Sequence, residues 1–156
     1  MSKKLLSDLK QSKPYSTLEE EVFINLQFTA DALMRVMAGL LKESGISPTQ
    51  YNVLRILRGA GETGLSCHEI GSRMITRDPD VTRLLDRLEK REFLSRSREE
   101  KDRRVITVRI TNSGLELLAV LDKPVQDLHS GLLGHVKKKK LESLTDLLDV
   151  ARGKTV

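Results

Sequence analysis

The stretch SCHEIGSRMITRDPDVTRLLDRLEK, residues 66–90, decides the fold of this chain because it contains two helix starts separated by a short polar turn. Ser66 and Glu69 have the spacing of a capping box, in which each side chain accepts from the other residue's backbone N–H. Further on, Asp78 is a suitable N-cap, Pro79 suits a first helical position and Asp80 complements the helix dipole. We therefore expect one helix to begin at Ser66 and a second at about Asp78.

The second helix has an apolar face and a basic face. Four apolar residues recur at i, i+3, i+4 and i+7, namely Val81, Leu84, Leu85 and Leu88. The opposite stripe carries Arg83, Arg87 and Lys90, and a basic second helix of a helix-turn-helix fits the major groove of DNA. The alternative is a solvated face on which Asp86 pairs with Arg83 and Lys90. The cap before the helix and the hairpin after it favour DNA contacts for the two arginines and leave Lys90 undecided.

Residues 94–98 and 105–110 have the pattern of two short strands joined by a polar tip, 99–104, so they predict a β-hairpin wing. Arg103 and Arg104 in the tip either keep an ordinary turn soluble or place one guanidinium in a narrow minor groove, and we favour the second interpretation. The residues expected to contact DNA are Arg77, Asp80, Thr82, Arg83, Arg87, Lys101, Arg103 and Arg104.

Three segments, 81–91, 102–104 and 110–114, resemble the MarR (multiple antibiotic resistance regulator) family of transcription factors. The resemblance implies a mostly α fold with a small β-wing (α+β): a winged helix-turn-helix that binds pseudo-palindromic operators as a homodimer and is often released by a small effector. Two features depart from the family pattern. Glu92 replaces the usual glycine after the recognition helix, so either the helix ends differently or strain is tolerated. Asp78 and Asp80 bring carboxylates close to phosphates, so an unusual operator is expected.

The flanking segments have the pattern of dimerisation helices. Residues 1–16 form a polar arm that we expect to be mobile or exchanged, and helical periodicity runs from Thr17 to about Glu43. Another helix is expected to follow Ser47. A further helix follows Thr111 and either continues or restarts at Pro124. The last helix carries the apolar residues Leu141, Leu144, Leu147, Leu148 and Ala151. We expect an arm and dimerisation helix in 1–45, the DNA-binding domain in 46–112 and C-terminal dimerisation helices in 113–156.

Length and charge agree with a DNA partner. The chain has 156 residues and a formal net charge of +5, and residues 73–109 alone contain twelve Lys/Arg against eight Asp/Glu. No apolar run reaches the roughly 18 residues of a membrane span, and no signal-peptide core follows Met1, so a cytoplasmic protein without membrane contact is expected. Cys67 is the only cysteine; it is either a small buried residue or, less often, an oxidant sensor.

The predicted function is sequence-specific transcriptional regulation by a homodimeric repressor on double-stranded DNA. The alternatives are a winged-helix protein-interaction module, favoured by Asp78 and Asp80, and a small-molecule-binding protein with a degenerate DNA module. The histidines lack metal-ligand spacing and no nucleophile–base grouping appears, so we expect no enzyme, metal or cofactor. The family resemblance further implies a cleft for a small apolar or aromatic effector near Met34, Met37, Tyr51 and Arg55, although their spacing is equally that of core packing.

Overall fold

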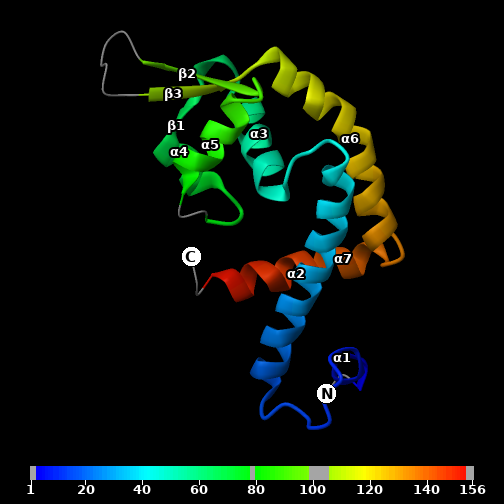
Figure 1. Ribbon diagram of the computed structural model, residues 1–156. Coiled ribbons are helices and arrows are strands. Elements are labelled where there is room, and N and C mark those ends of the chain that lie inside the picture. The colour runs from blue at the N-terminus through cyan, green and yellow to red at the C-terminus, as the bar shows by residue number, and fades with distance from the viewer. Residues whose placement is uncertain (1–2, 78–79, 99–105, 154–156) are drawn as a thin grey trace.

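A computed structural model describes residues 3–77, 80–98 and 106–153 of the chain. Within these residues the chain is mostly helical, with one small sheet at one end of the molecule (Figure 1), which confirms the predicted mostly α fold with a β-wing. The elements are α1 (Lys3–Asp8), α2 (Leu18–Lys42), α3 (Pro48–Ala60), the 3₁₀ turn η1 (Gly61–Thr63), β1 (Leu65–Ser66), α4 (Cys67–Arg73), α5 (Val81–Glu89), β2 (Leu94–Arg98), β3 (Ile106–Ile110), α6 (Asn112–Leu133) and α7 (Lys138–Arg152).

Side-chain caps set the starts of α3 and α4, as the sequence predicts. The Ser66 hydroxyl accepts from the Glu69 N–H at 3.3 Å, and the Glu69 carboxylate accepts from the Ser66 N–H at 2.8 Å. Ser47 and Gln50 form the same reciprocal pair before α3, with Pro48 at the first helical position. Because each bond spans only three residues, the local sequence is sufficient to place these helix starts.

The start of α5 differs from the prediction. The helix begins at Val81, and its N-cap is Asp80 rather than Asp78, which lies outside the described residues. The Asp80 Oδ1 accepts from the Arg83 N–H at 3.0 Å. A capping oxygen must reach an N–H two or three positions into the helix, so a helix that begins at Val81 takes its cap from the residue directly before it.

The sheet is antiparallel with strand order β1-β3-β2. Strands β2 and β3 form the predicted wing, with Leu94 opposite Ile110 and Arg98 opposite Ile106. Strand β1 was not predicted because two residues carry no readable alternation. It lies close against β3: a Cβ on Gly64, whose φ is +68°, would come within 2.6 Å of the Val108 carbonyl oxygen. Glycine is therefore required where the chain enters this strand.

The core lies where α3, α5, α6 and the sheet meet. The predicted inward stripe of α5 is buried, since Leu85 and Leu88 are 0% exposed and Leu84 is 8% exposed. They pack in one cluster with buried residues of the neighbouring elements, among them Val53, Leu54, Leu57, Ile70, Leu94, Val108 and Leu118. This burial fixes which side of α5 faces outward.

The turn after α5 has a left-handed residue although no glycine is present. Glu92 has a φ of +59°, its N–H donates to Glu89 O at 2.8 Å, and the Phe93 N–H donates to Leu88 O at 3.1 Å. These two bonds form a Schellman motif with a non-glycine residue at the left-handed position, so the strain that the sequence suggested is tolerated. Next to it, the Arg91 guanidinium donates to Gly45 O at 2.5 Å and stacks over Phe93. These contacts join the turn to the loop between α2 and α3.

The N-terminal segment differs from the prediction, whereas the helix after Thr111 continues at Pro124, one of the two courses expected. Residues 3–8 form the short helix α1, with Leu5 and Tyr15 buried, whereas we expected residues 1–16 to be a mobile or exchanged arm. The buried side chains show that the amphipathic Leu5 region can pack even in a lysine-rich segment. Helix α6 passes through Pro124 without a break. None of the helices in the described ranges is long and apolar enough to span a bilayer.

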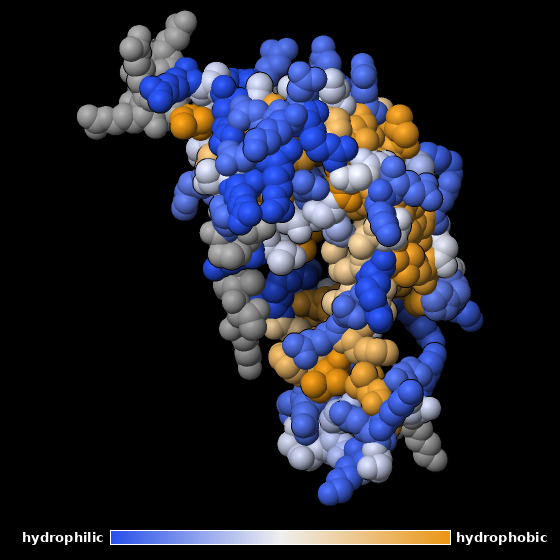
Figure 2. All heavy atoms as spheres, in the orientation of Figure 1, coloured by the Kyte–Doolittle hydropathy of each residue, from blue (hydrophilic) through white to orange (hydrophobic). Residues whose placement is uncertain are grey.

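Apolar side chains remain exposed on the terminal helices. Figure 2 shows hydrophobic atoms along α6 and the N-terminal half of α2, whereas hydrophilic atoms cover the region of α4 and α5. We define the terminal apolar surface as the exposed large apolar residues of α7 and of the first half of α2, which are Leu18, Val22, Phe23, Leu26, Leu144, Leu147 and Val150. A hollow of about 710 Å³ lies between these two helices.

Candidate nucleic-acid interface

The outward face of α5 carries the residues predicted to enter the major groove. Thr82, Arg83 and Arg87 are exposed, on the side opposite the buried leucines. Asp80, Arg83 and Arg87 line one hollow of about 190 Å³, so these three predicted contacts lie together. Neither arginine forms an ion pair or a side-chain hydrogen bond with another described residue. The alternative of a face held by Arg83–Asp86 and Lys90–Asp86 pairs is therefore not what the structure contains.

Arg77 lies in the turn before α5 and is also exposed. It lines a second hollow, of about 460 Å³, together with residues of α4. The same turn is attached to α3, because the Ile75 N–H donates to Asn52 Oδ1 at 3.0 Å. The turn that carries Arg77 is thus attached to α3 by a contact that the sequence did not reveal.

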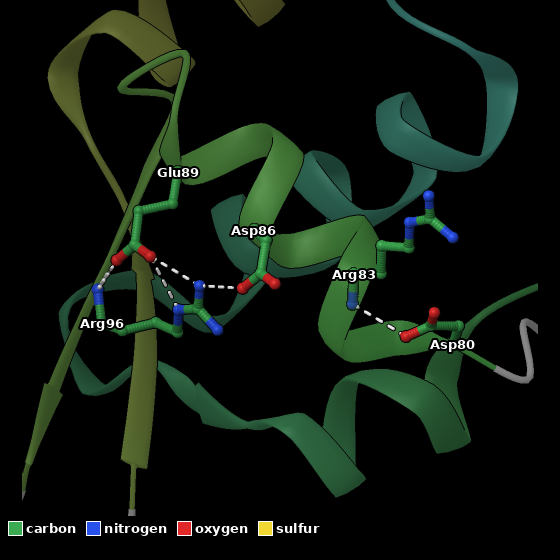
Figure 3. Close-up of polar contacts among 5 residues, drawn as sticks. All are labelled: Asp80, Arg83, Asp86, Glu89 and Arg96. Carbon is green, nitrogen blue, oxygen red and sulfur yellow. Dashed lines mark hydrogen bonds and ion pairs between the residues drawn. The ribbon is translucent and has the colours of Figure 1, made fainter.

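Asp80 has a structural task at this face. Figure 3 shows its carboxylate turned toward the backbone N–H of Arg83, while the Arg83 guanidinium extends away from the other acidic side chains drawn. A carboxylate at this position also complements the positive end of the helix dipole. The unusual acidic residue before α5 therefore stabilises the helix that carries the exposed arginines.

Arg96 in the middle of β2 joins the wing to the recognition helix. Its Nε donates to Glu89 Oε2 at 2.9 Å, and one terminal nitrogen donates to Glu89 Oε2 at 2.6 Å and to Asp86 Oδ1 (Figure 3). Its backbone N–H donates to Glu89 Oε1 at 3.2 Å. The hydrogen bonds with Glu89 and Asp86 raise the pKa of Arg96 above its usual value, so the guanidinium stays charged.

Sequence analysis missed Arg96, although a signal exists. Arg96 follows the buried Leu94 by two residues and therefore shares its inward side of the strand. An arginine on an inward strand face needs a carboxylate partner, and Asp86 and Glu89 are available on the helix before it. The predicted wing-tip contacts Lys101, Arg103 and Arg104 lie outside the described residues.

The four residues predicted near an effector cleft do line one cavity. Met34 and Met37 of α2 and Tyr51 and Arg55 of α3 border a space of about 530 Å³. Further residues complete the wall, which sequence analysis did not include: Leu33, Pro48, Asn52, Ile56, Ile75, Leu128, His129, Leu132 and Leu133. The Arg55 guanidinium lies 6.0 Å from the Tyr51 ring centroid, so a mostly apolar wall carries a cation on one side.

The remaining chemistry-bearing residues form no further site in the described ranges. Cys67 is half-buried at the start of α4, and no group of three or more His, Cys, Asp or Glu side chains is arranged to hold a metal ion among the residues described. The hydrogen bonds from the Ser66 backbone and hydroxyl hold the pKa of Glu69 below its usual value. That carboxylate serves the helix cap.

Comparisons with known proteins agree with this arrangement. The model of the MarR family matches residues 46–106. The repressor MdtR of Bacillus subtilis is 31% identical over 102 residues, which cover 65% of this chain and 64% of MdtR. In four curated regulators at 31–38% identity, the chain covers 49–64% of each protein's length.

Two solved structures show the same fold. A MarR transcription factor from Planctomyces limnophilus is 34% identical, with 88% of this chain and 99% of that chain covered and a TM-score of 0.67. A mutant MarR from E. coli, complexed with operator DNA, is 24% identical, with 87% and 99% covered and a TM-score of 0.77. On the basis of the match at 34% identity over most of both chains, the family model and the winged helix-turn-helix geometry, the chain belongs to the MarR family of transcriptional regulators.

Proposed function

We propose that the protein is a sequence-specific DNA-binding repressor that acts as a homodimer on a pseudo-palindromic operator. The observation that carries the proposal is the outward face of α5, where Arg83 and Arg87 are exposed and unpaired among the described residues. An arginine fork on a recognition helix can bind the O6 and N7 atoms of guanine. The relative bound to operator DNA and the relative named as a repressor support the same function.

The terminal apolar surface supports a dimer. Phe23 is 61% exposed and Leu147 is 66% exposed, and both belong to a surface that a second copy can cover. A two-fold dimer places two recognition helices about one DNA turn apart, which matches a pseudo-palindrome. The curated relative named above comes from a bacterium, in which DNA lies in the cytoplasm, so the proposal extends to a cytoplasmic location.

The cavity between α2, α3 and α6 supports relief of repression by a small molecule. Its volume of about 530 Å³ lies in the range of small-ligand sites, and its methionines and tyrosine suit an apolar or aromatic group. Ile75 lines the cavity and belongs to the turn that precedes the recognition helix. A bound effector would therefore contact the segment that positions the DNA-reading residues.

The interaction-module alternative is not favoured by any observation on the described residues. Its support was the acidic pair before α5, and the described member, Asp80, is used as a helix cap. A cap needs no protein partner to explain its charge.

Selection of bound duplexes from a random pool tests the proposal, and a palindromic sequence is the expected result. Arg83→Ala should then weaken binding to the selected operator by about 1–3 kcal/mol if the guanidinium contacts a base edge. Binding to a scrambled duplex should change less. Arg35→Ala, which removes an exposed arginine of α2, is the matched control. An equal loss of affinity for both duplexes would show that Arg83 contacts a phosphate. If the selection enriches no sequence at all, the proposed function is wrong.

A further inference from the structure

We propose that Arg96 is a positioning residue for operator recognition: by attaching wing strand β2 to Asp86 and Glu89 of α5, it sets the distance between the recognition helix and the wing. The inference rests on the proposed DNA-binding function and adds to it a residue that determines sequence preference without touching DNA. Figure 3 shows the guanidinium inserted between the two carboxylates.

Both the side chain and the backbone of Arg96 attach the strand to the helix. The guanidinium holds Glu89 through Nε at 2.9 Å and a terminal nitrogen at 2.6 Å, and the second carboxylate, Asp86, bonds the same nitrogen. The Arg96 backbone N–H also donates to Glu89 at 3.2 Å. Bonds from both the main chain and the side chain fix the strand itself to the helix, and a planar guanidinium allows little rotation in such an arrangement.

The two ends of this link belong to α5, which the proposal assigns to DNA, and to the wing, which the sequence predicts to contact the minor groove. On α5, Asp86 directly precedes Arg87 and lies three residues after Arg83, so it shares their helix turn. On the wing, Arg96 is the central residue of β2 and pairs with Val108 of β3, which is 0% exposed. A shift at Arg96 therefore moves both wing strands relative to the exposed arginines.

The donors of Arg96 are not directed at DNA. Its side chain is 21% exposed, and the side-chain hydrogen bonds that it forms with described residues go to the carboxylates of α5. Part-buried ion pairs add little net stability, because desolvation offsets their attraction, so a role in geometry explains the cluster better than a role in stability. Binding in the major and minor grooves at the same time requires a fixed distance between the recognition helix and the wing. A loosely held wing would add less affinity once the helix is bound.

The test separates geometry from charge. One guanidinium and two carboxylates give the cluster a net charge of about −1 at neutral pH. The triple variant Arg96→Met, Asp86→Asn, Glu89→Gln removes the link and leaves no net charge, so it repels phosphate less than the wild type does. We expect it to bind a scrambled duplex at least as tightly as the wild type. Its preference for the selected operator over that duplex should fall about tenfold.

Arg98→Met is the matched control. Arg98 lies two residues further along β2, is exposed and forms no side-chain hydrogen bond or ion pair with the described part of the chain. Its removal deletes one positive charge from the same strand and leaves the link intact. Affinity for operator and scrambled duplexes should change together, so the preference should remain as in the wild type. Arg96→Lys keeps the charge but cannot bind both carboxylates as a planar fork, and its preference should fall between those of the wild type and the triple variant.

DNA footprinting gives a second measurement, and loss of a residue that only stabilises the fold would not change the footprint. In the triple variant, hydroxyl-radical protection of the minor groove beside the operator should weaken, whereas protection of guanine N7 from methylation in the major groove should persist. Circular dichroism and thermal unfolding confirm that each variant is folded. A folded triple variant with wild-type preference and footprint would overturn the inference. A wild-type protein without any sequence preference would instead overturn the proposed function.

Discussion

Glu92 has a backbone conformation that is costly for a residue with a side chain. It occupies the left-handed position of the turn after α5, where glycine lacks the steric penalty of a Cβ. The surrounding bonds of the Schellman motif hold it there, and the neighbouring Arg91 contacts attach the turn to the loop between α2 and α3. These contacts hold the turn in place, and Glu92 remains in a strained backbone conformation.

Glu92→Gly should raise the free energy of unfolding by about 0.5–1 kcal/mol, because relief of the strain exceeds the added freedom of the unfolded chain. Urea denaturation measures the change. Glu116→Gly, in the exposed interior of α6, should lower the same quantity by about 1 kcal/mol. A destabilised Glu92→Gly protein would show that the left-handed conformation carries no strain here.

Asp80 combines a cap with a charge, and two substitutions separate them. Asp80→Ala should lower the free energy of unfolding by about 1 kcal/mol, whereas Asp80→Asn keeps a capping oxygen and should lower it less. Both should raise affinity for a scrambled duplex, because a carboxylate near phosphate is lost. Filter binding to operator and scrambled duplexes then shows whether Asp80 also reads sequence. An unchanged ratio of the two affinities would limit Asp80 to its structural role.

The capping box at the start of α4 contains a group that titrates, the Glu69 carboxyl. Both the Ser66 backbone N–H and its hydroxyl donate to Glu69 at 2.8 Å, which lowers the pKa of Glu69 from its ordinary value of 4.5. A carboxyl group whose pKa is lower in the folded state stabilises the fold above its unfolded pKa and loses that contribution as the pH falls through the folded value. The cap of α4 is therefore an acid-sensitive element.

The melting temperature of Glu69→Gln should lie below that of the wild type at neutral pH, and the difference should shrink as the pH falls from about 7 to about 3. Differential scanning calorimetry across this range measures it. The same pH dependence should persist at about 1 M salt, because hydrogen bonds rather than distant charges lower the pKa. A difference that stays constant with pH would mean that the charge of Glu69 does not contribute to the cap.

The molecule as a whole separates a polar DNA-facing module from apolar terminal helices (Figure 1, Figure 2). The module contains α3, α4, α5 and the wing, and the terminal apolar surface lies on α2 and α7. The cavity lies between them, lined by α2, α3 and α6. The cavity wall includes Ile75 of the turn before α5, so the cavity adjoins the segment that leads into this helix.

Leu147→Glu should convert a dimer into a monomer, because a charge would be buried against the second copy. Sedimentation equilibrium measures the mass, and operator affinity should fall by about 100-fold as two half-sites are no longer bound together. Val120→Glu, on an exposed apolar residue of α6 outside this surface, is the control. A dimeric Leu147→Glu protein would show that another surface joins the two copies.

Local signals in the chain were sufficient for most of the helices and for the exposed arginines of α5. The caps at Ser47 and Ser66 span three residues, and the apolar stripe of α5 repeats within nine. These interactions join residues that are close in the sequence, so the sequence alone predicts them. The four cavity residues, by contrast, were placed near one another only through the family resemblance.

Contacts between distant segments required the folded molecule. The pairing of β1 with β3, the bond from Asn52 to Ile75 and the contact of Arg91 with Gly45 join residues far apart in the chain. Arg96 lies only seven and ten residues from its carboxylate partners, yet a helix end and a turn separate them, so their meeting depends on how α5 packs against β2. Packing of whole elements, rather than any local pattern, brings these groups within hydrogen-bonding distance, because their separation depends on the orientation of one element against another.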